Sequence, residues 1–335
     1  MLDLDLESHR GFLRGVAYRM TGTVGDADDI VQEAFARTLA HPPKDRTRPM
    51  RPWLVSVTMN VARDVLRRRR RQGYVGPWLP GIVDDALVAE GVAADADSGV
   101  DNVEVRYGRK ESVTFAFLIA LEALTPLQRA VLVLREVYDF SGKETAAALG
   151  VSDDNVKTIL SRAKKALRPY SAAPVVPTVI RNERDATALQ RFLLSLANDD
   201  VDAALALLRE DVVATSDGGG VYSAGLKPWT GRDKVVEVWR KLMRLWPPGS
   251  FDVELVTLNA QPAIVLRAHE VRPELAPRWV IRADTDDEGR ITALHTLAAP
   301  AKLATLTPLS ACDAGFVPRP RPPSSSSTLP RTTGA

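Results

Sequence analysis

The sequence predicts a multidomain protein in which two all-α modules are followed by one α+β domain. Its 335 residues exceed one ordinary domain of roughly 150 residues, so two or three domains are expected. From Glu7 to Gln72 the apolar pattern is helical, with no alternating run typical of a strand. After Pro177 helical segments give way to short alternating or apolar runs, an order typical of an α+β fold.

The composition is that of a globular chain, with 45% apolar and 26% charged residues. No stretch approaches the roughly 18 apolar residues of a membrane helix, and the N-terminus MLDLDLE lacks the basic region of a secretion signal. We therefore expect a cytoplasmic protein with no membrane partner. One cysteine, Cys312, and four histidines favour neither a disulfide framework nor a metal site, and no cofactor is expected.

The net charge of +2 hides opposing blocks along the chain. Residues 1–72 hold 14 basic and 9 acidic side chains, and five of the basic ones form the run Arg67 to Arg71. Residues 73–111 reverse the balance with 3 basic and 8 acidic, and residues 126–170 return to 8 basic and 5 acidic. Two basic blocks around an acidic connector suggest a polyanionic partner, most often nucleic acid.

These changes divide the chain into a helical bundle, an acidic linker, a second helical module, a short linker, an α+β domain and a Pro/Ser-rich tail expected to be disordered. In chain order they are residues 1–72, 73–111, 112–170, 171–182, 183–303 and 304–335. Inside the acidic linker, Trp78 and Leu79 lie between two prolines. Such bulky residues are expected to dock on a domain surface.

In the α+β domain the pattern predicts helices that cover one side of a curved antiparallel sheet. The expected helices are residues 184–197, 201–208 and 234–245, and the expected strands are 251–258, 263–268, 278–283 and 291–297.

Residues 142–168, GKETAAALGVSDDNVKTILSRAKKALR, carry the strongest local motif. A short helix ends at Gly150, which tolerates positive φ, and a second helix begins after the N-cap Ser152. This predicts a helix-turn-helix whose second helix reads DNA. Its outward side chains suit base edges or phosphates, and with the N-cap they are Ser152, Asp154, Asn155, Lys157, Thr158, Ser161, Arg162 and Lys165. A plain helical hairpin with a solvated charged face remains the alternative.

A second basic helix is predicted over residues 51–72, RPWLVSVTMNVARDVLRRRRRQ. Two apolar stripes indicate that it is buried on two sides. A third stripe is polar and presents a ladder to a phosphate backbone, formed by Ser56, Asn60, Arg63, Arg67 and Arg70. The alternative is a solvated helix end with a fortuitous arginine cluster, with Pro52 and Trp53 serving only as a hydrophobic wedge.

Two basic helical modules joined by a flexible linker suit two separated promoter elements, and the chain resembles bacterial sigma factors of the extracytoplasmic-function group. GDADDIVQEAFARTLA followed by RPWLVSVTMNVARDVLRRRRR resembles sigma domain 2. LTPLQRAVLVLREVYDFSGKETAAALGVSDDNVKTILSRAKKALR resembles sigma domain 4. The resemblance implies a non-enzymatic factor that directs core RNA polymerase to promoter DNA, with contacts to the β′ clamp helices and the β flap.

The resemblance also assigns residues. The acidic helix of domain 2 would contact the clamp helices through Asp29, Gln32, Glu33 and Arg37. The loop 41–50, HPPKDRTRPM, would receive a base flipped from the −10 element, at a cost of a few kcal/mol. Backbone contacts there are expected from Lys44, Arg46 and Arg48, beside Trp53 and the polar stripe of the basic helix. Two prolines in this loop depart from the family and leave the preferred base open. The domain 4 helix would read the −35 element.

After Pro177 the chain resembles a SnoaL-like domain, a cone-shaped α+β fold fused to a subset of these sigma factors. Relatives carry a Trp-Leu-Pro motif, here Trp78-Leu79-Pro80, and an Asp-Gly-Gly-Gly motif, here Asp217-Gly218-Gly219-Gly220. A third motif, Asn-Pro-Asp-Lys-Leu, is present only as Ala299-Pro300-Ala301-Lys302-Leu303. The resemblance implies that this extension replaces a separate anti-sigma factor. Because glycines permit close backbone approach, we hypothesise that the first two motifs share one interdomain surface, with an ordinary strand-end turn as the alternative.

SnoaL-like folds also include enzymes, and the candidates to line a catalytic cone here are Asp217, Trp229, His269 and His295. Spacing alone identifies no acid-base pair among them. The sequence also leaves open whether this domain binds a small ligand. It leaves open as well the alternative of a helix-turn-helix regulator that is not a sigma factor and carries a ligand-sensing or enzymatic C-terminal domain.

Overall fold

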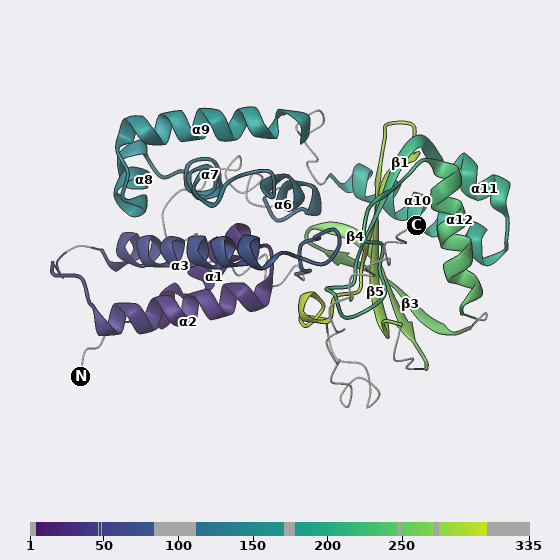
Figure 1. Cartoon of the computed structure of the whole chain (residues 1–335), viewed down its shortest axis with the longest axis horizontal. Coiled ribbons are helices and arrows are strands. Elements are labelled where there is room, and N and C mark those ends of the chain that lie inside the picture. The colour runs from purple at the N-terminus through teal and green to yellow at the C-terminus, as the bar shows by residue number, and fades with distance from the viewer. Residues whose placement is uncertain are drawn as a thin grey trace, which may run out of the picture.

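The computed structural model describes residues 5–45, 47, 49–83, 112–170, 178–246, 249–270 and 275–306. Helices fill one half of the molecule and the α+β domain fills the other (Figure 1). The acidic part of the linker after Val83, most of the linker 171–182 and the tail after Leu306, for which we predict disorder, lie outside the described residues.

The first module is a helical bundle, as predicted, and its main elements are three α-helices. After a short 3₁₀ turn come α1 (Arg10–Thr21), α2 (Val24–Ala40) and α3 (Met50–Gln72). Gly22 ends α1 in the left-handed conformation, with φ of 74°. Thr23 caps α2 by accepting a hydrogen bond from the Asp26 amide.

The second module contains the predicted helix-turn-helix. Its helices are α6 (Phe115–Leu121), α7 (Pro126–Leu132), α8 (Gly142–Leu149) and α9 (Asp153–Leu167), with a π-helical turn, Val133–Val137, after α7 and a 3₁₀ turn, Arg168–Tyr170, after α9. Gly150 takes the expected left-handed conformation, with φ of 66°. The side chain of Ser152 accepts from the amide of Asn155 and so caps the recognition helix.

The two helical modules share one hydrophobic core. A single cluster of buried side chains runs from Phe12 and Leu54 in the first module to Leu118 and Tyr138 in the second. The rings of Phe12 and Tyr138 meet edge to face with centroids 5.2 Å apart. Helix α3 contacts α1 and α2 of its own module and also α7 and α8 of the second, and in Figure 1 it lies between α2 and the second module. The modules are therefore packed together, where the sequence suggested two units joined flexibly.

The α+β domain begins earlier than predicted. Its helices are α10 (Val179–Ala197), α11 (Val201–Ala206) and α12 (Arg232–Arg244). Thr178 caps α10 through the amide of Arg181, so the domain starts before residue 183. The second helix ends at Ala206 and not at 208, because Leu208 already pairs with the sheet.

The sheet has six strands in the order β2-β1-β6-β5-β4-β3. They are β1 (Leu208–Asp217), β2 (Trp229–Thr230), β3 (Phe251–Leu258), β4 (Gln261–Ala268), β5 (Arg278–Thr285) and β6 (Ile291–Leu297), and a 3₁₀ turn at Pro300–Lys302 follows. The expectation of a wholly antiparallel sheet is wrong, since β1 and β6 run parallel with Thr215 opposite His295. Local alternation marks a strand but carries no information on the direction of a neighbour that is far along the chain.

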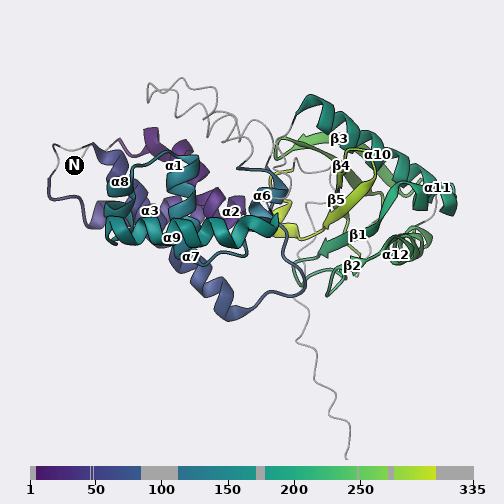
Figure 2. The same cartoon turned by 90° about the horizontal axis from the view of Figure 1, so that it is seen from above.

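The sheet separates two hydrophobic regions. One face packs against α10, α11 and α12 around Phe192 and Trp239. The opposite face packs against linker residues Leu79 and Ile82 and against Phe115 of α6. In Figure 2 the sheet accordingly stands between α10 to α12 and the helical half. This second face joins the C-terminal domain to the helical half.

Candidate nucleic-acid interface and interdomain site

The residues expected to bind polymerase lie on one exposed face of α2. Gln32 and Glu33 follow Asp29 by three and four residues, Arg37 follows Glu33 by four, and all four are exposed. Arg37 Nε lies 2.7 Å from Glu33 Oε1, a surface pair of small energy. The face is free for a partner in this structure.

The first part of the expected −10 site is open to solvent. Lys44 in the loop and Asn60 on α3 are exposed, and Trp53 is 38% exposed. Arg63 donates to Asn60 Oδ1 at 3.3 Å, and burial followed by the charge of Arg67 lowers the pKa of Arg63. Arg46 and Arg48 lie outside the described residues.

Other residues of the same predicted stripe contact the second module. Ser56 Oγ donates to the carbonyl of Ala148 at the end of α8, at 2.8 Å. Arg70 donates to the carbonyl of Leu124, which precedes α7. The module that carries the helix-turn-helix therefore bonds two polar groups of the predicted DNA face of α3, of which Ser56 is half-buried and Arg70 stays exposed.

A buried arginine that sequence analysis missed holds the two modules together. Arg129 of α7 is 2% exposed and donates to the carbonyl of Met20 in α1 at 2.7 Å. It also pairs with Glu122 at 2.6 Å, and Arg69 of α3 reaches the same carboxylate at 2.8 Å. Burial lowers the pKa of Arg129, against the opposing effect of Glu122. No local motif distinguishes this arginine from a surface residue.

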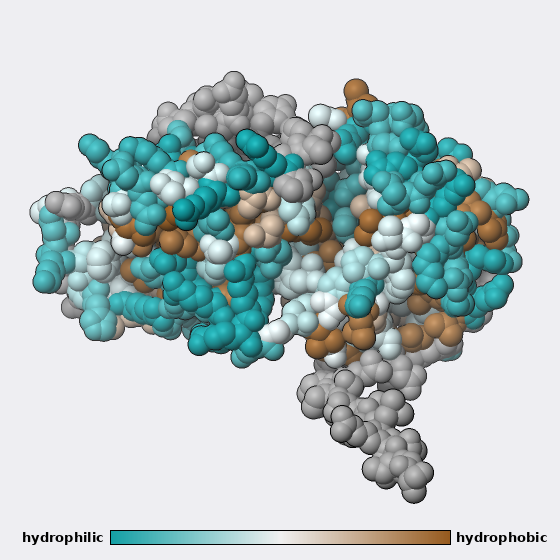
Figure 3. Space-filling view, turned by 45° about the horizontal axis from the view of Figure 1, so that its top comes forward, coloured by the Kyte–Doolittle hydropathy of each residue, from teal (hydrophilic) through white to brown (hydrophobic). Residues whose placement is uncertain are grey.

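The residues expected to read the −35 element form one exposed surface on α9. All eight, from Ser152 to Lys165, are exposed, while Val156, Ile159 and Ala163 are buried on the other side of the helix. Lys157 lies 3.1 Å from Asp154 and 3.2 Å from Asp153. The face drawn in Figure 3 is largely hydrophilic over the helical half. Helix α9 thus offers a polar face suited to a major groove.

The two motifs assigned to interdomain regulation meet at Asp217. Asp217 as a whole is 1% exposed, and its carboxylate accepts from the amide of Leu79 at 2.8 Å and from the hydroxyl of Tyr74 at 2.7 Å. Lys302 Nζ lies 2.6 Å from it. The end of β1, the linker and the C-terminal 3₁₀ turn therefore share one buried polar centre.

Lys302 completes this centre, although the sequence presented it only inside a poorly matching motif. Its ammonium donates to the carbonyl of Leu79 at 2.6 Å and lies 4.5 Å from the ring centroids of both Trp78 and Tyr74. Burial lowers the pKa of Lys302 to about 8, while Asp217 opposes the shift. Burial and the adjacent Asp217 carboxylate raise the pKa of Tyr74.

Close approach at this centre requires glycine. A Cβ on Gly219, which has φ of +65°, would lie 2.9 Å from the Cβ of Ala299. A Cβ on Gly22 would lie 2.5 Å from the ring of Trp78, whose indole thus rests on the end of α1. Leu79 is buried at 1% exposure. The Trp-Leu-Pro segment is therefore docked between the two halves.

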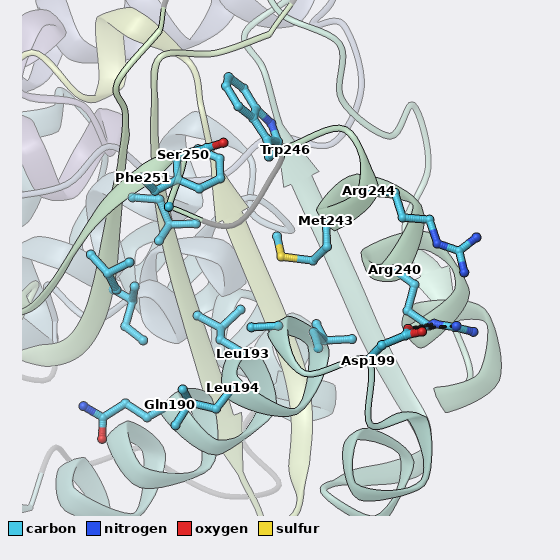
Figure 4. A pocket seen from close by; sticks show the side chains of 16 residues that line it. Gln190, Leu193, Leu194, Asp199, Arg240, Met243, Arg244, Trp246, Ser250 and Phe251 are labelled. Carbon is cyan, nitrogen blue, oxygen red and sulfur yellow. Dashed lines mark hydrogen bonds and ion pairs between the residues drawn. The ribbon is translucent and has the colours of Figure 1, made fainter.

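A separate cavity of about 860 Å³ lies in the C-terminal domain between α10, α12, β3 and β4 (Figure 4). At its edge Arg240 forms an ion pair with Asp199 at 2.8 Å. The volume is typical of small-molecule sites. Much of the lining is apolar and includes Leu193, Leu196, Met243, Phe251, Ile264 and Leu266.

None of the four residues considered for catalysis lines this cavity. His295 Nε2 lies 3.3 Å from Asp284 on the sheet, and its ring is near that of Phe115 in the helical half. His269 is at the surface, where a hydrogen bond to Asp252 raises its pKa. Asp217 belongs to the interdomain centre, and Trp229 lies on β2. The structure does not bring these side chains together.

Two kinds of feature are absent from the described part of the chain. Within it, no three His, Cys, Asp or Glu side chains are grouped so that they could hold a metal ion. None of its helices combines the length and apolar character needed to cross a bilayer.

Known families match the three parts of the chain in order. Sigma-70 region 2 matches residues 6–72, Sigma-70 region 4 matches residues 115–167, and the SnoaL-like domain matches residues 189–297. The ECF RNA polymerase sigma factor SigJ of Mycobacterium tuberculosis is 32% identical over 308 residues, which cover 89% of this chain and 92% of that protein. The probable ECF RNA polymerase sigma factor SigI of the same species is 29% identical over 310 residues, covering 91% and 94%.

A solved structure agrees with these matches. The crystal structure of the Mycobacterium tuberculosis sigma factor SigJ aligns with a TM-score of 0.64 at 28% identity, covering 90% of this chain and 96% of that one. Regions 2 and 4 on one helical half define a transcription initiation factor. The chain belongs to the ECF RNA polymerase sigma factors and carries a fused SnoaL-like domain. The alternative of a regulator that is not a sigma factor is therefore wrong.

Proposed function

We propose that this sigma factor acts in the cytoplasm and binds its partners through three surfaces of the helical half. Helix α2 binds the β′ clamp helices of core RNA polymerase through Asp29, Gln32, Glu33 and Arg37, and the second module lies at the β flap. The loop 41–50 and α3 recognise and melt the −10 element. Helix α9 reads the −35 element. The chain itself catalyses no covalent chemistry.

The observation that carries this proposal is the division of α9 into two faces. Its apolar side is buried against the module, and its polar side, capped at Ser152, is exposed from end to end. A helix presented in this way can lie in a major groove, where Asn155 near its N-terminus and Arg162 farther along suit base edges and Lys165 suits a phosphate.

The −10 surface supports a further step in the proposal. Ser56 and Arg70 belong to the predicted DNA stripe of α3, yet both are bonded to main-chain carbonyls of the second module. Promoter binding by Ser56 and Arg70 requires both hydrogen bonds to the second module to break, whereas Asn60 and Arg67 of the same stripe are already exposed. We therefore interpret this arrangement as closed, and we propose that the C-terminal domain modulates activity by holding it.

Transcription with purified core polymerase on genomic DNA tests the main proposal. The full chain should yield transcripts that start at a small set of sites, and Asp29→Lys with Glu33→Lys should remove them by abolishing binding to the polymerase. Glu237→Lys on α12 is the matched control, because Glu237 is an exposed acid outside the proposed polymerase surface. Absence of specific initiation by the unaltered chain under every condition would contradict the proposal.

The cavity of the C-terminal domain favours a second candidate function, the binding of a small ligand. It is large enough for a metabolite and mainly apolar, with Arg240 and Arg244 at its edge. Thermal melting of the full chain with a metabolite panel tests this function. A true ligand raises the melting temperature, and Leu193→Trp, which fills the cavity, removes the effect. A panel without effect, or an effect unchanged by Leu193→Trp, contradicts it.

A further inference from the structure

The tip of the β3–β4 hairpin lies where the C-terminal domain meets both helical modules. Its two turn residues, Asn259 and Ala260, connect the paired residues Leu258 and Gln261. They have φ of +55° and +61°. Asparagine tolerates this left-handed conformation, whereas at Ala260 glycine would be less strained. The turn thus holds an asparagine side chain in a fixed position at the end of a stiff hairpin.

Asn259 makes contacts outside its own domain through its side chain and its backbone amide. Its amide donates to the carbonyl of Val83 at 2.9 Å, and its Oδ1 accepts from the amide of Val83 at 3.1 Å. Its Nδ2 donates to the hydroxyl of Tyr18 at 2.7 Å and to the carbonyl of Val113 at 2.9 Å. The residue is 0% exposed. One side chain therefore joins α1, the linker and the start of the second module.

Neighbouring hydrogen bonds extend the same junction. The hydroxyl of Tyr18 donates to the carbonyl of Gly81 at 2.8 Å. Gln261, on the other side of the turn, accepts from the amide of Phe115 at 3.3 Å. Phe115 begins α6, so the hairpin tip holds the first residues of the second module at two points.

This junction bears on the covered face of α3. Tyr18 belongs to the module that carries Ser56 and Arg70, while Val113 and Phe115 belong to the module whose main-chain carbonyls accept hydrogen bonds from these two side chains. A contact that fixes both modules to one hairpin tip limits their separation. Its loss favours an arrangement in which Ser56 and Arg70 of α3 are released to bind DNA.

We propose that Asn259 at the tip of the β3–β4 hairpin is the clasp that keeps the two sigma modules closed over α3. Releasing it raises promoter-directed initiation. This inference rests on the proposed function, because the effect of releasing the clasp is measured as initiation at promoters, which requires α3 to bind the −10 element.

Two glycine substitutions in the same turn test the clasp in the full chain. Asn259→Gly removes three side-chain hydrogen bonds but suits the positive φ and leaves the amide free to bond Val83. Loss of these buried bonds should shift the closed-to-open equilibrium by roughly tenfold or more. Ala260→Gly is the matched control, since it relieves the same type of backbone strain and keeps every bond of Asn259. It should leave the equilibrium closed.

Fluorescence energy transfer between labels at Ala40→Cys and Lys143→Cys, with Cys312→Ser, reports the separation of the modules. Both label sites are exposed, one at the end of α2 and the other on α8. Asn259→Gly should lower the transfer and raise specific transcript yield with limiting core polymerase several-fold, while Ala260→Gly matches the unaltered chain. Circular dichroism and a melting curve check that each variant is folded.

Unchanged energy transfer in a folded Asn259→Gly variant would overturn the clasp. Lower transfer without higher transcript yield would overturn the claim that closure limits initiation. If Asn259→Gly does not fold, Tyr18→Phe replaces it, because this substitution removes one side-chain partner of Asn259. It should likewise lower the energy transfer and raise the transcript yield, and either result missing would overturn the same claim as above. The unaltered chain distinguishes failure of the clasp from failure of the proposed function. If the proposed function is wrong, the unaltered chain supports no specific initiation, whatever energy transfer it shows.

Discussion

The ammonium of Lys302 lies 2.6 Å from the carboxylate of Asp217, and the two side chains are 6% and 0% exposed. Leu79 takes part on both sides, because its amide donates to Asp217 and its carbonyl accepts from Lys302. A buried ion pair that also satisfies linker backbone groups ties the C-terminal domain to the segment between the helical half and the sheet.

Loss of the acid in this pair should be costly. Asp217→Asn leaves the Lys302 ammonium buried without its counter-charge, so the free energy of unfolding should fall by about 3 kcal/mol in urea denaturation. Asp211→Asn on the same strand is the control, since its pair with Arg209 is exposed and its loss should cost less than about 1 kcal/mol. An equal decrease in the free energy of unfolding in the two variants would show that the buried pair stabilises the fold no more than the exposed pair does.

The same lysine predicts a pH dependence. Burial lowers the pKa of Lys302 to about 8 from the ordinary 10.5, so between these values the unfolded chain binds a proton that the folded chain has released. Stability from this group therefore rises with pH across the window and is lost as pH falls towards 8. Urea denaturation should show a slope up to about 1.4 kcal/mol per pH unit steeper in the unaltered chain than in Lys302→Met. Parallel slopes would contradict the depressed pKa.

The docked tryptophan should affect transcription. Its ring rests on Gly22, and the guanidinium of Arg69 lies 4.6 Å from its centroid. Trp78→Ala removes both contacts and should change promoter output in a reporter assay, as should deletion of residues 178–335. Leu226→Ala, at a residue that is 71% exposed, is the control and should have no effect. Output unchanged by both the alanine variant and the deletion would argue against an interdomain regulatory surface.

The recognition helix should show the salt dependence of phosphate binding. Lys165→Ala removes one exposed cation from α9, so the slope of log affinity against log salt should become shallower by about 0.9 on duplex DNA with the −35 element. Lys234→Ala, an exposed lysine on α12, should leave the slope unchanged. Fluorescence anisotropy titrations at several salt concentrations measure both, and equal slopes for Lys165→Ala and the unaltered chain would remove Lys165 from the DNA interface.

Much of the local structure followed from short-range signals. Gly150 and Ser152 mark the turn of the helix-turn-helix, and the structure has the left-handed glycine and the N-cap at those positions. Strands 251–258 and 291–297 have the predicted bounds. The short strand at Trp229 was missed, because two residues are too few to display a period of two.

Long-range partners were harder to predict. Asp217 was chosen from its motif, but nothing in the sequence identified Lys302, 85 residues away, as its buried partner. Asn259 carried no signal at all beyond its place in a turn, since its hydrogen bonds reach Tyr18, 241 residues away. Buried polar groups are nearly always satisfied, yet which atom satisfies them depends on the packed structure.

By itself, the sequence determined the helices, most of the strands and the polar face of α9, because periodicity and capping act within a few residues. The family followed from the resemblance of two segments to sigma domains 2 and 4. Only the tertiary structure decided that the two helical modules share one core and that Ser56, expected on a DNA face, donates to Ala148. An apolar stripe requires burial, which contributes about 25 cal/mol per Å² whichever surface covers it. The choice of that surface depends on close packing between segments far apart in the chain.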